Sequence, residues 1–367
     1  MIQHIALDNF KCFAHQELAL RRLNVFSGVN GMGKSTMIQA VLLLAQAYIQ
    51  DFLPHQVNLN GEFVHFGSGR DIFYEAAEQD QISICLNING KMCPFVMLYD
   101  EFADLLRLDE REYDSEALKI FRHMDYLSAE RIAPQDLYGK SSYEVEHRSR
   151  IGNKGEYALH YLSSHMQDPV DKKFFSYFET SDDGHNFILG EAVQYWLQVV
   201  SPGIRFDIQT PMNLQALQLQ YYYQGTAVQG SIKSNMYRPT NVGFGITYVL
   251  PVLVALLKAK KDDILLLENP EAHLHPHGQR MMGELIALCA KGGTQIFMET
   301  HSDHVLNGIR IAVKKKRINA EDVSMCFFYR QDKQHCVKTL EMDGDGRLEE
   351  WPDGFFDEWD KALDEIL

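Results

Sequence analysis

A glycine-rich segment that ends in lysine and serine stands at residues 28–36, and its spacing, Gly28-x4-Gly33-Lys34-Ser35, is that of a phosphate-binding loop. Glycines let backbone N–H groups close around a polyphosphate, and the following helix directs its positive end at the same anion. Lys34 would reach the β- and γ-phosphates, and the Ser35 hydroxyl would bind Mg²⁺. An ordinary glycine-rich turn is the alternative, but strand, loop and helix follow in the order that the motif requires. The residues expected at the phosphates are Asn30, Gly31, Met32, Gly33, Lys34, Ser35 and Thr36.

A second motif is an apolar run that ends in an acid, Ile264-Leu-Leu-Leu-Glu268. Such a run predicts a central strand with its carboxylate at the C-terminal tip, the edge where open α/β sheets bind their ligands. Glu268 would hold Mg²⁺ there, directly or through water. A buried strand followed by a solvated turn is the alternative, and the phosphate loop in the same chain makes it the weaker one.

The third motif is another buried strand, in Phe297-Met-Glu299-Thr300-His301. A histidine at a strand tip beside a terminal phosphate can form a hydrogen bond with it and respond to its loss. A lone histidine is more often structural, so this interpretation of His301 depends on the other motifs.

The fourth motif, Gly243-Phe-Gly245-Ile-Thr247, stands at the head of an apolar helix. Glycines and a hydroxyl at a helix N-terminus form an anion site. Because the phosphate loop already supplies one such site, a second in the same chain suggests a phosphate that is shared between two subunits.

The elements that must position these residues follow from hydrophobic periodicity. Strands are expected at residues 2–7, 23–27, 263–267 and 294–298, and helices at 37–48, 244–260 and 276–290. Residues 62–99 look β-rich, including 63–66, and the charged residues 100–123 are expected to be helical. Residues 136–200 are polar and partly helical, and strands return after residue 203. This alternation predicts a parallel sheet with crossover helices.

Composition excludes several classes of protein. The 367 residues carry a formal net charge of −15, which argues against broad DNA binding by the monomer but leaves nucleic-acid binding through a local basic patch open. One local basic patch, Lys314-Lys-Lys-Arg317, fits a solvated helix end better. The six cysteines form no C-x-x-C pair, which fits a reducing cytosol and disfavours structural zinc. No signal pattern and no membrane-length apolar run are found, so we expect a cytoplasmic protein without a membrane segment.

The order of the four motifs resembles that of an ABC-type ATPase head. Leu7-Asp-Asn9-Phe10-Lys11 looks like the opening of the RecF, SMC and OLD-like branch, in which a basic residue after Asn-Phe contacts the nucleotide; here it is Lys11. Glu268-Asn-Pro-Glu-Ala-His-Leu-His-Pro276 resembles the Asp-Glu-Pro-Glu-x-His-Leu-His-Pro stretch of that branch. The likeness covers nearly the whole chain and is closest to compact AAA-family ATPases associated with bacterial antiphage defence.

The resemblance implies ATP and Mg²⁺ as ligands and a homodimer that buries two ATP molecules head to tail. Gly243, Gly245 and Thr247 would then meet the phosphate held by the other chain. Gln135 is the candidate for the glutamine that senses Mg²⁺ between the lobes, and a surface loop residue is its alternative. The implied role is a nucleotide-gated switch for a partner effector, with a nuclease encoded nearby as the candidate.

Three departures from the family pattern concern hydrolysis. Glu268 replaces the usual Asp and can still bind Mg²⁺, whereas Asn269 replaces the usual catalytic Glu and cannot accept a proton. Glu271 could substitute if the turn at Pro270 aims it inward; otherwise it caps the following segment or pairs across the dimer. Thr247-Tyr248 replaces a Ser-Gln pair: the Thr keeps the hydroxyl of the Ser, and the sequence does not explain the Tyr. Slow hydrolysis is therefore expected.

These observations predict an α/β, two-lobed ATPase head with a mixed or parallel phosphate-loop sheet, an antiparallel β subdomain and a helical insertion. The N-terminal lobe with the phosphate loop would span residues 1–135, the inserted lobe 136–200, the C-terminal lobe with the other motifs 201–330 and a tail 331–367. Three alternatives remain: an ATP-binding scaffold with negligible hydrolysis, a DNA-repair-type ATPase acting on DNA ends, and a nuclease with an unrecognised metal site.

Overall fold

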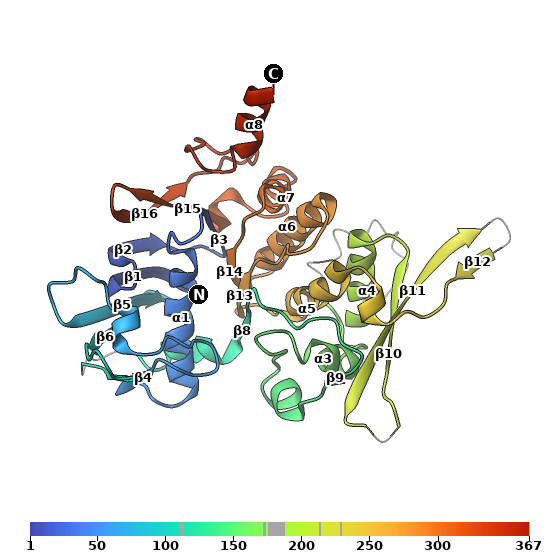
Figure 1. Ribbon diagram of the computed structural model, residues 1–367, viewed down its shortest axis with the longest axis horizontal. Helices are drawn as coiled ribbons and strands as arrows, with labels where there is room; N and C mark the ends of the chain where they lie inside the picture. Colours follow the sequence, from blue (N-terminus) through green and yellow to red (C-terminus); the bar gives the residue numbers. More distant parts are fainter. Residues whose placement is uncertain (110–113, 172–173, 175–187, 213, 228–229, 367) are drawn as a thin grey trace.

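A six-stranded sheet forms the centre of the molecule (Figure 1). The computed structural model describes residues 1–109, 114–171, 174, 188–212, 214–227 and 230–366. In sheet order the six strands are β16 (Gln334–Leu340), β15 (Val323–Gln331), β3 (Leu23–Gly28), β14 (Gln295–Glu299), β13 (Ile264–Glu268) and β8 (Met124–Leu127). The strands from β15 to β8 run parallel, and β16 pairs with β15 antiparallel.

The central strands are apolar along their length because both faces of the sheet are covered, as parallel sheets require. Leu266 of β13 and Phe297 of β14 face one core, and Leu265 and Met298 face the other. Helix α1 (Lys34–Ile49) packs in the first core, where 12 of its 16 residues are buried. The second core contains buried residues of α5 (Phe244–Lys258), α6 (Pro276–Lys291) and α7 (Asp303–Lys314).

An antiparallel sheet packs on the far side of α1 and shares the first core with it. Its order is β2 (Phe13–Ala19), β1 (Ile2–Phe10), β5 (Gln81–Ile88) and β6 (Lys91–Leu98). Nearby lie the short pair β4 (Gln56–Asn58) and β7 (Leu105–Arg107) and the single-turn helix α2 (Gly69–Ile72). The predicted combination of a phosphate-loop sheet with an antiparallel β part is confirmed.

A second group of elements surrounds α5 on the other side of the molecule (Figure 1). It contains α3 (Ala158–Ser164), α4 (Leu189–Val200) and a third sheet of β9 (Tyr138–Gly139), β10 (Ile204–Gln209), β11 (Ala216–Ala227) and β12 (Gly230–Lys233). Shorter turns of helix occupy Ala117–His123, Tyr143–His147, Pro239–Asn241 and Ala320–Asp322. The partly helical character expected for residues 136–200 is present in the described part of that range.

Two local predictions were wrong. Residues 63–66 form a loop rather than a strand, because the backbone N–H groups of Phe63 and Val64 bond the Gln46 side chain, at 2.8 and 3.2 Å. The helix expected over residues 100–123 is replaced by β7, which pairs with β4, and by a single short helix at its end. Residues 110–113 of that range lie outside the described residues.

The C-terminal segment begins with β16 and ends in α8 (Glu358–Ile366), which projects from the body in Figure 1. Phe355 anchors this segment: it is buried and meets the Phe327 ring edge to face at 5.4 Å. Within the described ranges, no helix is both long and apolar enough to cross a bilayer.

Candidate functional site

The phosphate loop connects the end of β3 to the start of α1, and its glycines are required by both space and backbone. A Cβ on Gly28 would lie 2.1 Å from the Phe328 carbonyl oxygen, because β15 runs directly alongside. Gly33 has a φ of +98°, and a Cβ there would lie 2.6 Å from the Phe13 ring. Gly31 also has a positive φ, but nothing lies within 4 Å of its Cβ position. The loop is therefore packed firmly at its two ends and open in the middle.

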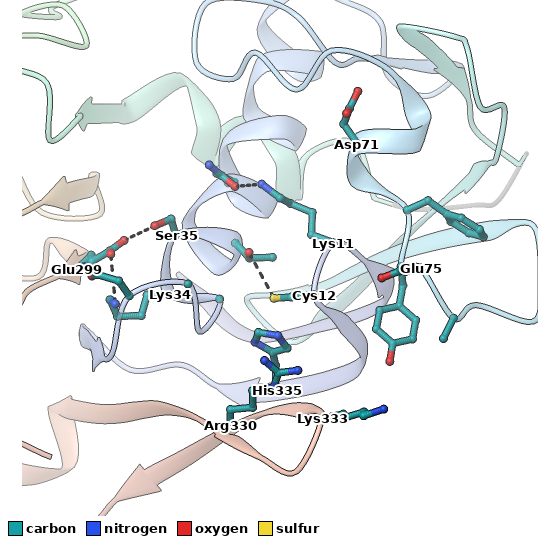
Figure 2. Close-up of a pocket in the computed structure, with 18 residues that line it drawn as sticks. Lys11, Cys12, Lys34, Ser35, Asp71, Glu75, Glu299, Arg330, Lys333 and His335 are labelled. Carbon is teal, nitrogen blue, oxygen red and sulfur yellow. Dashed lines mark hydrogen bonds and ion pairs between the residues drawn. The ribbon is translucent and has the colours of Figure 1, made fainter. Parts of the chain in front are cut away.

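A cavity of about 790 Å³ opens at this loop (Figure 2). Six of the seven residues expected at the phosphates line it, namely Asn30, Gly31, Gly33, Lys34, Ser35 and Thr36. Met32 is not in the lining and packs against the first core instead. Lys11 lines the cavity as expected, with its Nζ 2.6 Å from Gln39 Oε1 and 4.9 Å from the centre of the Phe66 ring.

Lys34, Ser35 and Glu299 form a compact cluster at one end of the cavity, joined by dashed lines in Figure 2. The Ser35 hydroxyl donates to Glu299 Oε2 at 2.7 Å. Lys34 Nζ donates to the carbonyl oxygens of Gly28 and Val29 at 2.9 and 3.0 Å and lies 3.8 Å from Glu299 Oε1. The Lys34 side chain is only 3% exposed, and burial lowers its pKa.

Glu268 stands one strand further from the loop, opposite Glu299 in the register of β13 and β14. Its carboxylate accepts hydrogen bonds from the Tyr126 hydroxyl and from the Ala129 backbone N–H, both at 3.1 Å. It therefore turns toward β8 and lines a separate cavity of about 680 Å³. Burial is the main cause that raises the pKa of Glu268, and the nearby charge of Glu299 raises it further.

The Arg131 side chain holds the turn after β13. The buried guanidinium donates to the carbonyl oxygens of Glu268 and Asn269, each at 2.6 Å, and burial lowers the pKa of Arg131 to about 10. Asn269 adopts a φ of 45°, and its buried Oδ1 has no hydrogen-bond partner in the described structure. Arg131 therefore fixes the backbone at the position where the catalytic acid was expected.

Glu271 is buried and binds the end of β14. Its Oε1 accepts from the Thr300 hydroxyl at 2.8 Å and from the His301 backbone N–H at 3.1 Å. Its other oxygen, Oε2, has no partner in the described structure. These bonds suit a residue that holds His301 in place.

His301 follows β14 and lies at the back of the phosphate loop. Its Nε2 is 3.8 Å from Glu299 Oε1, and its side chain lines a smaller cavity of about 370 Å³ with Gly28, Val29 and part of the C-terminal segment. Burial first and the charge of Lys34 second lower the pKa of His301.

The helix-head motif sits against the turn that follows β13. Gly245 lies so close to it that a Cβ would be 2.3 Å from the His273 carbonyl oxygen. Gly243 and Phe244 are exposed, whereas Thr247 is 2% exposed and points its hydroxyl inward. In this conformation the accessible part of the motif is therefore Gly243–Gly245.

Two further observations concern residues outside the cavity. Tyr248, which sequence reasoning left unexplained, stacks on Phe244 at 4.8 Å and meets the His273 ring edge to face at 4.8 Å. Gln135 is exposed on a loop, where its backbone N–H donates to the Tyr138 hydroxyl at 3.2 Å. Gln135 is not in the cavity lining, and its role remains a prediction.

Sequence reasoning missed two features of the cavity. Glu299 was noticed only as part of the strand that precedes His301. The β15–β16 hairpin contributes Arg330, Lys333 and His335 to the lining, opposite Lys11 in Figure 2. A basic cluster around a strand–turn–strand pattern at residues 330–335 is the signal that could have identified the hairpin.

The donors present fit a magnesium nucleotide. Ser35 and Glu299 offer a hydroxyl and a carboxylate oxygen in the cavity, and Glu268 offers a second carboxylate one strand away; Mg²⁺ prefers such oxygen ligands. Among the described residues no group of three or more His, Cys, Asp or Glu could hold a metal by itself.

Comparison with known proteins gives matches along the chain. The family model described as AAA ATPase domain matches residues 1–194, which is more than half of the 367 residues. A second AAA domain model matches residues 235–307, and a family of proteins of unknown function matches residues 318–366.

Individual relatives are more distant. The DNA replication and repair protein RecF of Halothermothrix orenii is 31% identical over 94 residues, which cover 25% of this chain and 24% of that protein. The OLD nuclease of Thermus scotoductus is 23% identical over 380 residues, which cover 93% of this chain and 66% of that protein. The chain thus spans less than two thirds of the length of either relative.

Solved structures show the same fold at low identity. The SmcHead bound to the C-winged helix domain of ScpA superposes with a TM-score of 0.52 at 14% identity, covering 93% of this chain and 98% of that one. The Smc head with an extended coiled coil, bound to the C-terminal domain of ScpA derived from Pyrococcus furiosus, gives a TM-score of 0.50 at 14% identity. That match covers 100% of this chain and 99% of the other.

Proposed function

This chain belongs to the family of AAA ATPase domains, and we propose that it acts as an ATP-gated switch whose two copies close on two nucleotides and control a partner effector. It is an ABC-type ATPase of the RecF, SMC and OLD-like branch. The observation that carries the proposal is the cavity at the phosphate loop, where Lys34, the Ser35 hydroxyl and the Glu299 carboxylate meet.

Each group in the cavity has a task in nucleotide binding. The loop N–H groups and the start of α1 receive the phosphates. Lys34 supplies a positive charge to the β- and γ-phosphates, and Ser35 supplies an oxygen to Mg²⁺. The cation, when bound, neutralises the charge of the phosphates. Lys11 and the β15–β16 hairpin face the same space and would contact the rest of the nucleotide.

Assembly through the nucleotide is supported by the position of the helix-head motif. Gly245 packs on the turn after β13, so the motif and the phosphate loop belong to the same edge of the six-stranded sheet. A twofold arrangement would therefore set the loop of one subunit against the motif of the other, with both contacts equivalent. The exposed ring of Phe244 adds apolar surface beside Gly243.

The partner effector that the switch would control belongs to the same proposal. We propose a nuclease encoded nearby, acting in antiphage defence, and the name of the OLD nuclease supports a link between this kind of head and nucleic-acid cleavage. The free state of all six cysteines agrees with action in the reducing cytoplasm. An ATPase that acts on DNA ends is the rival suggested by the name of the RecF protein, but the net charge of −15 disfavours it.

Calorimetry with Lys34→Ala tests nucleotide binding. The variant loses a charged contact to the phosphates, so we expect ATP to bind about 10- to 100-fold more weakly than to the parent. Lys291→Ala, an exposed lysine at the end of α6, serves as the control and should bind like the parent. Equal affinity in Lys34→Ala and the parent would show that the phosphate-loop assignment is wrong.

Steady-state phosphate release by the parent separates the switch from a scaffold that holds ATP without turning it over. Release that is slow but abolished in Lys34→Ala supports the switch. A parent that binds ATP and releases no phosphate above the level of Lys34→Ala supports the scaffold.

A further inference from the structure

Glu299 stands at the end of the strand that adjoins the phosphate-loop strand. It ends β14, which lies between β3 and β13 in the sheet. β3 leads directly into the phosphate loop, and β13 carries the acid that sequence reasoning assigned to Mg²⁺. Because parallel strands end at one edge, the side chain at the tip of β14 stands nearer to the loop than the one at the tip of β13.

The contacts of Glu299 agree with this position. Its Oε2 accepts the hydrogen bond of the Ser35 hydroxyl at 2.7 Å. Its Oε1 lies 3.8 Å from Lys34 Nζ and 3.8 Å from His301 Nε2. One carboxylate therefore reaches the three groups expected to meet Mg²⁺ or the terminal phosphate.

The last residue of β13 and the residue that follows it are poorly suited to the same task. Both oxygens of Glu268 already accept hydrogen bonds, from Tyr126 and from the Ala129 backbone, on the side away from the loop. The following residue, Asn269, carries a neutral amide. The acid that lies next to the loop serine therefore comes from β14, as Glu299, and not from β13.

We propose that Glu299, rather than Glu268, is the carboxylate that works with Ser35 to hold the magnesium ion of the bound nucleotide. This inference rests on the proposed nucleotide-binding function. A carboxylate next to the loop serine provides the hard oxygen that Mg²⁺ takes directly or through one of its waters. Glu299 also orients Ser35 by accepting the hydrogen bond of its hydroxyl, so that the lone pairs of the hydroxyl oxygen remain free for the metal.

The test compares Glu299→Gln with Glu268→Gln, using binding of a non-hydrolysable ATP analogue with Mg²⁺ and with EDTA. Each substitution removes one charge and keeps the shape of the side chain. Glu299→Gln should lose about 10- to 100-fold of the affinity gain that Mg²⁺ provides, while its affinity in EDTA stays close to that of the parent or increases. Glu268→Gln should keep most of the gain. Mn²⁺ in place of Mg²⁺, followed by electron paramagnetic resonance, reports the metal directly and independently of turnover.

A third variant separates a metal-binding role of Glu299 from a structural role. Glu299→Asp keeps the charge on a shorter side chain and should restore part of the metal-dependent gain, whereas a merely structural role would leave the Asp and Gln variants equally impaired. Binding in EDTA shows that the loop of each variant is folded. The proposal is overturned if Glu299→Gln keeps the parental gain, or if Glu268→Gln loses as much or more. A parent that binds no nucleotide at all would instead overturn the proposed function itself.

Discussion

Asn269 has a backbone φ of 45°, in the left-handed region that asparagine tolerates better than most residues. The two hydrogen bonds from Arg131 hold this conformation. The amide oxygen of Asn269 can accept a bond from water but cannot carry a proton away. Residue type and backbone geometry thus agree with each other, and the neutral amide predicts slow hydrolysis.

We predict that Asn269→Glu hydrolyses ATP faster than the parent in single-turnover assays. A carboxylate there can act as a general base, which is typically worth about 10²–10⁴-fold. Asn269→Gln is the matched control, because it has the same longer side chain and the same backbone cost, about 1–2 kcal/mol in the left-handed region. If the Glu and Gln variants turn over equally, the slow step does not depend on a base at this position.

Glu271→Gln in the same assay examines the nearest carboxylate in sequence. Both bonds that Glu271 accepts, from Thr300 and from the His301 backbone, can also be accepted by an amide oxygen. We therefore expect little change in ATP affinity and only a small change in rate. Loss of most of the activity with intact ATP binding would make Glu271 the base.

Local sequence patterns were sufficient to predict the phosphate loop and the central strands. The glycine and lysine spacing of the loop and the apolar runs of β13 and β14 were identifiable because a loop around phosphate and strands buried on both faces restrict the residue types. The contact of Ser35 with Glu299 could not be predicted from the sequence, because it joins residues 264 positions apart and depends on β14 lying between β3 and β13. The strand prediction for residues 63–66 was wrong for a related reason: the N–H groups of Phe63 and Val64 bond a side chain of α1.

The β15–β16 hairpin is an element whose function appears only in the assembled sheet. β16 lies in the predicted tail and pairs with β15 at the edge of the six-stranded sheet. The hairpin brings Arg330, near the end of β15, and Lys333, in the turn, to the cavity. Both side chains are exposed, so their attraction for a nucleotide is weakened by solvent and by salt.

We predict that Lys333→Ala weakens ATP binding by about 1.5- to 5-fold at low ionic strength, the range expected for an exposed charge pair. The effect should shrink as salt is added. Lys338→Ala is the control on the same hairpin: its ammonium pairs with Glu350 at 2.7 Å, and it does not line the cavity. Titrations at two salt concentrations provide the measurement, and equal affinities for Lys333→Ala and Lys338→Ala would remove the hairpin from the binding site.

At the scale of the whole molecule, the described elements form one group around α1 and another around α5, with the six-stranded sheet between them (Figure 1). The lobe boundaries near residues 135, 200 and 330 remain a prediction, and we propose that the group around α1 and the group around α5 shift relative to each other when nucleotide binds. Lys11 and the phosphate loop belong to the first group, and Gly243 is the N-cap of α5 in the second. Binding across two copies would therefore couple the relative position of both groups to the nucleotide.

The final prediction concerns this coupling and uses Gly243. Its φ is −55°, and a Cβ at this position would have Ile246 Cδ1 as its nearest neighbour at 3.9 Å, so the fold can accept a side chain there. Aspartate is a favourable N-cap and should stabilise α5. In the proposed dimer, however, its carboxylate would face the terminal phosphate of the partner and repel it. We expect Gly243→Asp to bind ATP like the parent and to lose ATP-promoted dimerisation, measured by light scattering.

Gly243→Asn is the neutral control, because it caps the helix equally well without the charge and should still dimerise. Gly245→Asp is a poorer choice, since any Cβ at Gly245 would meet the His273 carbonyl oxygen at 2.3 Å and disturb the subunit itself. The repulsion should be greatest at low ionic strength, because salt screens charges. Normal ATP-promoted dimerisation of Gly243→Asp under those conditions would mean that this surface does not meet a phosphate. The two subunits would then have to join through another face.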